Sequence, residues 1–439
     1  MFRWGRMVSL LYVAMNNSLV GIWEHKSNGE ESFQYLDSWI NSPLSRGLSL
    51  SLPVVKQKYT NLKVKNFFSN LIPERDNVIE AIQRRYKLTT KSSFDLLNII
   101  GVDCIGAIQI SPDPDVLIQK KEIEGDIISE SEMAKKIRAL RIPNSVINDG
   151  DLDFRISLTG VQEKTAFLYH NGHWMTPKGA TATTHIFKSA IGKIPEYLVL
   201  SNSVENEWYT ERFFNNMGLN TASSQILTFE NQKVLAVKRF DRIVTDHSII
   251  RLPQEDFCQV LGIPSQQKYQ SYGGPNPKDI IDILKGSSNI KDPANFFKAL
   301  IVNWIVGSTD AHAKNYSIFI GKNNTYKLTP FYDVMSFFPY VGTKKNQVHE
   351  SKLKLAMSAR GKHGNKYVIN QIDRSNWELT GKYLGLPLKV TNDIIEEVIE
   401  SVPLALDKTN NELPKDFDRS VSEPITEYVT KYYQRLKNS

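Results

Sequence analysis

The sequence has few cysteines and lacks a long hydrophobic segment. Its 439 residues contain two cysteines, Cys104 and Cys258, which lie far apart and form no metal-binding spacing. Two isolated thiols suit a reducing compartment, so we expect a cytoplasmic protein. The apolar run Met7–Met15 is too short to span a bilayer, and we expect no membrane partner.

Internal repeats and low-complexity tracts are also absent from the sequence. A hydrophobic content of 41% and a charged content of 23% are typical of folded globular proteins, and the length allows two or three domains. The net charge of +7 permits contact with nucleic acid or another anionic partner. The basic residues are widely spread, however, so this excess also fits an ordinary solvated surface.

Residues 1–145 are predicted to form an N-terminal α/β subdomain. The runs Val8–Met15 and Leu19–Glu24 flank a turn of asparagines and predict a β-hairpin. Alternation of apolar and polar residues predicts a half-buried strand over Ser45–Val54. Pro, Asn, Asp and Gly cluster around Pro143–Asp151, and we place the domain boundary there.

The second predicted domain, residues 146–439, begins with strands. A TGVQE loop joins two of them, and its backbone N–H groups could cover phosphates. A single glycine, Gly160, fits an ordinary hairpin equally well. The next strand ends at Lys188, where a lysine could neutralise phosphates.

A helix predicted over Val204–Met217 carries three glutamates that could hold Lys188. We predict Glu207 as the partner, as a helix-borne glutamate pairs with a strand lysine in kinases. The alternative is a charged, solvated helix face. The following strand leads to Phe240, which could contact an adenine ring or simply pack in the core.

The stretch Gly307–Asn315 (GSTDAHAKN) organises the second domain. It follows an apolar helical pattern, and Asp310 precedes Asn315 by five positions, with Asp333 after a later strand. Protein kinases use this order: one carboxylate accepts a hydroxyl proton, while an asparagine and a later aspartate hold metal. An alternative interpretation is a loop whose polar side chains cap backbone groups. Strands before this stretch and helices after it predict a two-lobed, kinase-like α+β fold.

Five motifs occur in an order that resembles the HipA family, the serine/threonine-kinase toxins of type II toxin–antitoxin modules. They are DFRISLTGVQEKT, THIFK, RLPQEDFCQ, STDAHAKN and TPFYD. The resemblance extends over nearly the whole chain. It implies a small α/β N-terminal subdomain and a mainly helical C-terminal lobe.

The resemblance also assigns roles at the site. It implies that Asp310 is the catalytic base, that Asn315 and Asp333 are Mg²⁺ ligands, and that Ser157 is a site of autophosphorylation. The residues implied to bind ATP are Thr159, Gly160, Val161, Gln162, Glu163, Lys164, Lys188, Lys238, Arg239, Phe240, His312, Ala313, Lys314, Asn315, Tyr332 and Asp333.

The implied partners are a HipB-like helix-turn-helix antitoxin dimer, operator DNA and a protein substrate such as glutamyl-tRNA synthetase. Lys382 matches a basic DNA-contacting position, whereas Gly385 replaces a second basic residue, so Lys389 could substitute for it. The expected function is an ATP- and Mg²⁺-dependent kinase toxin that also acts with its antitoxin as an operator corepressor. The alternatives are a catalytically silent corepressor and a kinase of small molecules.

Overall fold

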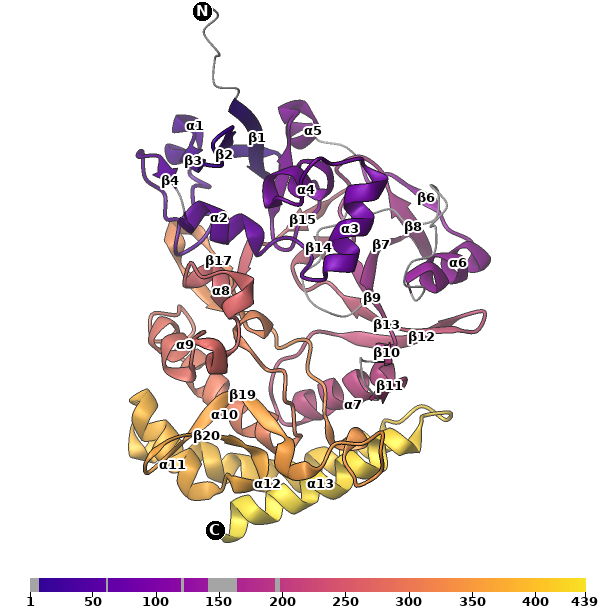
Figure 1. The fold of residues 1–439 in the computed structure, drawn as a ribbon, viewed down its shortest axis with the longest axis vertical. Coiled ribbons are helices and arrows are strands. Elements are labelled where there is room, and N and C mark those ends of the chain that lie inside the picture. The colour runs from indigo at the N-terminus through magenta and orange to yellow at the C-terminus, as the bar shows by residue number, and fades with distance from the viewer. Residues whose placement is uncertain (1–7, 61, 120–121, 141–163, 194–197) are drawn as a thin grey trace, which may run out of the picture.

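The computed structural model describes residues 8–60, 62–119, 122–140, 164–193 and 198–439. Figure 1 shows an N-terminal body beside a second sheet, with the C-terminal helices packed below them. This is the two-lobed α+β arrangement that the sequence predicts. In these described ranges, no helix combines the length and apolar character needed to cross a membrane.

The N-terminal body is built on an antiparallel sheet with strand order β4-β3-β2-β1-β5. Its strands are β1 Val8–Met15, β2 Ser18–Lys26, β3 Glu31–Tyr35, β4 Tyr59–Thr60 and β5 Ile108–Ser111. The predicted hairpin is confirmed, because β1 pairs with β2 across Asn16 and Asn17. Both asparagines have positive φ angles, 45° and 66°, a turn conformation that asparagine tolerates well.

Short helices cover this sheet: α1 Asp37–Ile40, α2 Leu62–Ser69, α3 Asp76–Arg85, α4 Ser93–Ile100 and α5 Pro114–Ile118. Trp23 stacks on Phe68 with ring centroids 3.8 Å apart, and both side chains are fully buried. The N-terminal body therefore has its own aromatic core.

The strand expected over Ser45–Val54 is wrong. Leu48 and Leu52 are buried, as the alternation suggested, but the segment is a loop inserted between the N-terminal body and the C-terminal part. Side chains bind its backbone in place of a neighbouring strand. The Tyr35 hydroxyl accepts from the Leu48 N–H at 2.7 Å, and Glu255 accepts from the Leu50 N–H at 2.8 Å.

The second sheet is antiparallel and has the strand order β12-β13-β9-β7-β8-β6. Its strands are β6 Gly125–Ile127, β7 Lys164–His170, β8 His173–Pro177, β9 His185–Ser189, β12 Ser224–Phe229 and β13 Gln232–Lys238. Helix α6 (Glu130–Leu140) and helix α7 (Ser203–Asn216) pack against β13. The boundary predicted at residue 145 falls outside the described residues, but β6 and α6 precede it and already pack with the second sheet.

The remaining strands are short pairs and one three-stranded sheet. They are β10 Gly192–Lys193, β11 Val199–Leu200, β14 Arg242–Val244, β15 Ile249–Arg251, β16 Gln254–Asp256, β17 Ser317–Ile320, β18 Tyr326–Leu328, β19 Lys354–Gly361 and β20 Gly364–Val368. The C-terminal helices are α8 Phe257–Val260, α9 Pro277–Leu284, α10 Asp292–Ile305, α11 Arg374–Leu384, α12 Leu388–Asn411 and α13 Arg419–Asn438. One large core joins α7 to these helices, so the sheet is anchored directly on the helical lobe.

Candidate active site

A cavity lies where the second sheet, the helical lobe and the N-terminal body meet. The predicted site residues that line it are Lys164, Lys188, Lys238, Arg239, Phe240, Asp310, His312, Lys314, Asn315, Tyr332 and Asp333. Ala313 is fully buried behind this wall. Ser157 and Thr159–Glu163 lie outside the described residues. Lys382 is exposed on α11, away from the cavity.

Lys188 lies near the end of β9 and is shared by two carboxylates. Its ammonium group binds Glu207 of α7 and lies 2.7 Å from Oδ1 of Asp333. The predicted pairing of Lys188 with Glu207 is therefore confirmed. Burial would lower the pKa of Lys188, but the two carboxylates outweigh burial and raise it, so the lysine stays charged.

Asp333 has a φ of 59°, in a region that residues other than glycine rarely adopt. The backbone just before it is fixed, because Phe331 bonds to Asn220 and Ala222 through its N–H and C=O groups. Burial would raise the pKa of Asp333, but Lys188 and Lys164 hold it well below its ordinary value. The carboxylate is therefore ionised throughout the neutral range.

Lys164 stands opposite Lys188 on the neighbouring strand β7. Burial lowers the pKa of Lys164 to about 8; Lys188 acts in the same direction, and Asp333 opposes it only in part. Two lysines thus face the cavity from adjacent strands, beside the described end of the predicted phosphate-covering loop.

Asp310 lies on the loop that follows α10. Gly307 turns the chain with a φ of 65°, and a Cβ there would lie 2.5 Å from the Phe338 ring. The Asn315 side-chain N–H donates to the Asp310 carbonyl at 2.8 Å, which closes the loop. The Asp310 carboxyl is 61% exposed and accepts a hydrogen bond from the Tyr269 hydroxyl. Desolvation by the surrounding protein atoms raises the pKa of the Asp310 carboxyl to about 6, although the hydrogen bond from Tyr269 acts to lower it.

His312 and Lys314 are both buried in the wall of the cavity. Lys314 points its ammonium group at Asp256, 2.6 Å away, and at Oδ1 of Asn70, 2.8 Å away. Its charge is therefore engaged in tying the loop to the N-terminal body. Burial, together with the nearby charge of Lys268, lowers the pKa of His312 to about 3, so this imidazole is neutral.

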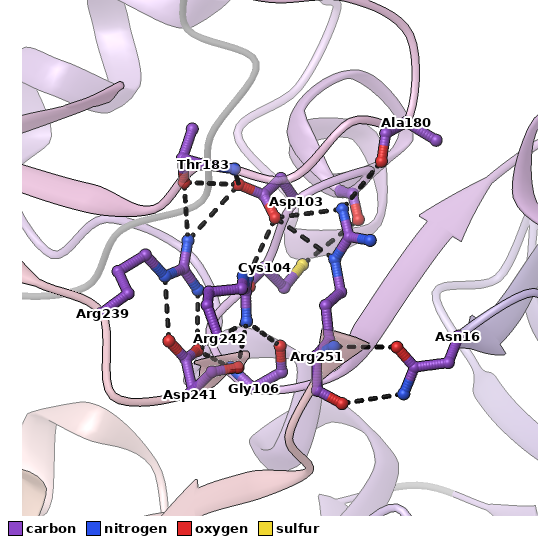
Figure 2. A network of polar contacts seen from close by, with 11 residues as sticks. Asn16, Asp103, Cys104, Gly106, Ala180, Thr183, Arg239, Asp241, Arg242 and Arg251 are labelled. Atoms are coloured by element: carbon purple, nitrogen blue, oxygen red, sulfur yellow. Dashed lines mark hydrogen bonds and ion pairs between the residues drawn. The ribbon is translucent and has the colours of Figure 1, made fainter. Parts of the chain in front are cut away.

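Arg239 belongs to a buried polar network, which Figure 2 shows in detail. Its guanidinium group binds Asp241 at 2.8 Å, the Thr183 hydroxyl at 2.9 Å and the Cys104 carbonyl at 3.0 Å. Asp103 lies at its centre. The Arg239 side chain thus holds the connector after β13 in place, and the Arg239 backbone is bonded as well, through its N–H to Thr184 and through its C=O to Arg242.

The aromatic part of the cavity wall lies next to this connector. The rings of Phe240 and Tyr332 are 5.6 Å apart, and both residues line the cavity. The Tyr332 hydroxyl donates to the Lys314 carbonyl at 2.8 Å, which fixes its ring. Two fixed aromatic rings form a suitable flank for a planar base.

Asn315 and Asp333 present oxygen atoms that suit a hard cation. Asn315 donates a hydrogen bond through its side-chain N–H, and Asp333 accepts one at Oδ1. Within the described part of the chain, the other oxygen of each pair, Oδ1 of Asn315 and Oδ2 of Asp333, takes part in no hydrogen bond. No group of three or more His, Cys, Asp or Glu side chains arranged for metal binding occurs among the described residues. Two protein oxygens fit Mg²⁺, which usually completes its coordination with phosphates and water.

Sequence reasoning missed the contribution of the N-terminal body. Asn70, Leu71, Glu74 and Ile105 also line the cavity. Glu74 binds the Lys268 ammonium group at 2.5 Å, beside the Asp310 loop. Nothing in the local pattern of these residues signals a role, because Glu74 and Asn70 meet their partners 194 and 244 positions further along the chain.

Comparisons with known proteins give a consistent result. The family model of the HipA N-terminal domain matches residues 11–111, and that of the HipA-like C-terminal domain matches residues 156–406. The Y4mE protein of Sinorhizobium fredii is 29% identical, over 92% of this chain and 93% of its own length. The serine/threonine-protein kinase toxin HipA of Shewanella oneidensis is 26% identical, over 86% of this chain and 84% of its own.

A solved structure has the same fold as this chain. It contains HipA of Shewanella oneidensis MR-1 with HipB and operator DNA, and it matches with a TM-score of 0.78 at 23% identity. The match covers 97% of this chain and 96% of that one. The kinase-like fold expected from the sequence is therefore confirmed.

Proposed function

The chain belongs to the HipA family, and we propose on this premise that it is an ATP- and Mg²⁺-dependent serine/threonine protein kinase. One observation carries the proposal: residues from separate segments converge on a single cavity. Lys188 comes from β9, Glu207 from α7, Asp310 and Asn315 from the loop after α10, and Asp333 from beyond β18. This set matches the parts that phosphoryl transfer requires.

Each residue has a distinct role in the proposed reaction. Glu207 fixes Lys188, whose positive charge binds the nucleotide phosphates. Asn315 and Asp333 would hold Mg²⁺, which offsets negative charge on the phosphates when bound. Asp310 orients the acceptor hydroxyl and takes its proton. Catalysis then comes mainly from positioning and from electrostatic stabilisation of the transferred group.

The connector after β13 supports nucleotide binding in this proposal. Lys238 and Phe240 present backbone groups to the base, Arg239 fixes the connector between them, and Phe240 and Tyr332 flank the base. Thr159–Lys164 covers the phosphates. Ser157 is the proposed autophosphorylation site, and its phosphate would add roughly two negative charges beside this loop and repel ATP.

We further propose that the kinase is the toxin of a type II toxin–antitoxin module in the cytoplasm. The fold match to a HipA bound to HipB and operator DNA supports a HipB-like antitoxin dimer as partner. The complex then represses its operator, with exposed basic residues such as Lys382 or Lys389 near the DNA. The proposed substrate is a protein such as glutamyl-tRNA synthetase.

A direct test uses purified, phosphatase-treated protein with labelled ATP and Mg²⁺. Asp310→Ala should lower phosphoryl transfer by about 10²–10⁴-fold, the usual contribution of a general base. Asp246→Ala, on the exposed β14–β15 turn, is the matched control and should keep full activity. Mass spectrometry of the labelled protein should place the phosphate on Ser157. Equal labelling of wild type and Asp310→Ala would remove Asp310 from the mechanism.

The runner-up is a catalytically silent corepressor. The match to the HipA–HipB–operator structure fits this function as well. Retention of Lys188, Asp310, Asn315 and Asp333 in one cavity argues against it. The two proposals separate in cells, because a silent corepressor would repress its operator without slowing growth.

A further inference from the structure

The segment Lys268–Gly274 (KYQSYGG) lies beside the Asp310 loop and has no assigned role. Within it, the Tyr269 hydroxyl donates a hydrogen bond to Oδ1 of Asp310. The Tyr269 ring packs edge-on against the His312 ring, with centroids 4.9 Å apart and planes at 84°. One side chain thus contacts both polar residues of the Asp310–His312 stretch.

The backbone around Tyr269 is held on several sides. The Tyr269 carbonyl accepts from the Gly274 N–H at 3.0 Å, and the adjacent Lys268 carbonyl accepts from the Ala313 N–H at 3.3 Å. The segment closes so tightly that a Cβ on Gly274 would lie 1.8 Å from the Gln267 carbonyl oxygen. Gln270 also accepts from the Ser358 N–H of β19 at 2.9 Å. The hydroxyl of Tyr269 is therefore presented from a fixed support.

The Asp310 carboxylate has little else to orient it. Asn315 bonds only the backbone carbonyl of Asp310. Nε2 of His312 is 3.9 Å from Oδ1, beyond hydrogen-bond distance, and its imidazole is neutral. Across the described residues, Tyr269 provides the one hydrogen bond to this carboxylate. A side chain that is 61% exposed would otherwise rotate freely.

We propose that Tyr269 is a positioning residue for phosphoryl transfer: its hydroxyl holds Oδ1 of Asp310, so that Oδ2 faces the acceptor hydroxyl. The inference rests on the proposed kinase function and deepens it. Tyr269 acts through Asp310, with no contact of its own to the transferred group. A small misplacement of a catalytic group can cost a large part of the rate, so the loss of one orienting hydrogen bond should be measurable.

The test compares Tyr269→Phe with wild type in the same phosphatase-treated, full-length protein. The phenylalanine ring keeps the packing on His312 and loses only the hydroxyl. We expect kcat to fall by about 10–100-fold while KM for ATP stays within about twofold, as for a group that acts only in the transition state. Tyr272→Phe is the matched control, because Tyr272 is 74% exposed, contacts the Tyr269 ring and does not bond Asp310.

A second variant separates positioning from a structural role. Adding Tyr269→Phe to Asp310→Asn should cause no further loss, since both changes then act through one group. The melting temperature of Tyr269→Phe should match that of wild type.

Each of the following results would overturn the inference. An unchanged kcat would remove the role, and a faster one would make Tyr269 a blocking group. Parallel changes in KM and melting temperature would make it structural. A phosphate on Tyr269 would make it an acceptor. If wild type itself transfers no phosphate, the kinase proposal fails first and this inference falls with it, whereas an active wild type with an equally active Tyr269→Phe sinks the inference alone.

Discussion

At the scale of single residues, the site depends on a lysine that two acids share. The Lys188 side chain is 8% exposed, and its partners Glu207 and Asp333 come from different elements. A buried charge is tolerated only when it is paired, so these three groups stabilise one another. Lys188 therefore holds Asp333 in place, and under the proposed function it also binds phosphate.

Lys188→Met tests this dual function. The variant removes the positive charge and leaves Glu207 and Asp333 without their common partner, so we expect kinase activity to fall by about 10²–10³-fold. Lys233→Met is the matched control. Lys233 of β13 binds Glu205, which lies on α7 as Glu207 does, but this pair lies outside the cavity. Labelling with ATP measures both variants. Activity of Lys188→Met close to that of wild type would contradict the role.

At the scale of elements, the connector after β13 is fixed from the N-terminal body. Asp103 accepts from Arg242 at 2.9 Å, from Arg239 at 3.3 Å and from Arg251 at 3.3 Å (Figure 2). Burial would raise the pKa of Asp103, yet the three guanidinium groups lower it well below its ordinary value. The Asp103 carboxylate thus joins the loop before β5 to the connector after β13, to β14 and to β15.

Asp103→Asn should lower the free energy of unfolding by about 3–5 kcal/mol, because Arg251 loses its ion pair with Asp103 and the buried Arg239 and Arg242 are left to share Asp241. It should also raise KM for ATP, since Arg239 and Asp241 line the cavity. Asp126→Asn breaks an exposed ion pair with Lys178 and should cost under about 1 kcal/mol. Denaturant unfolding and ATP titration measure the two effects. An Asp103→Asn protein as stable as wild type would show that the network is dispensable.

At the scale of the whole molecule, the N-terminal body and the helical lobe share buried polar contacts. Glu255 of β16 is 1% exposed, and its Oε1 accepts from the Leu50 N–H at 2.8 Å. Its Oε2 has no partner among the residues that the structure describes. Burial raises the pKa of Glu255 to about 8, although the Leu50 N–H and the nearby Ser49 hydroxyl act to lower it. The interface therefore contains a carboxylic acid that is neutral at neutral pH.

This acid should make stability depend on pH. Between its ordinary pKa of 4.5 and about 8, the folded protein keeps a proton that the unfolded chain has released. The free energy of unfolding should therefore decrease as the pH rises through this window. Glu255→Gln keeps the acceptor for Leu50 and should remove this part of the slope, whereas Glu423→Gln on the exposed face of α13 should retain it. Denaturation curves at pH 5, 7 and 9 give the free energy of unfolding of each protein. If Glu255 had no such role, this free energy would change with pH equally in wild type and in Glu255→Gln.

Local patterns in the sequence predicted the helix that carries Glu207, the apolar helix before Gly307, the first hairpin and the pairing of Lys188 with Glu207. They failed over Ser45–Val54, where alternating burial reflects a loop between two bodies instead of a strand. They also gave no sign of Tyr269, because it lies 41 positions before its partner Asp310 and has no motif of its own. Asp103 bonds side chains up to 148 positions away, so the members of its network become recognisable only after the chain has folded.

The connection between Lys314 and Asn70 has a consequence for protein synthesis. A ribosome makes the N-terminal body and the second sheet before the helical lobe. A nascent chain that stops after the second sheet carries Lys188 and Glu207 but neither Asp310 nor Asp333. Under the proposed function, such an unfinished chain cannot phosphorylate anything. Under that function, phosphoryl transfer begins only after translation has passed residue 333 and the loop that carries Lys314 has docked onto Asn70.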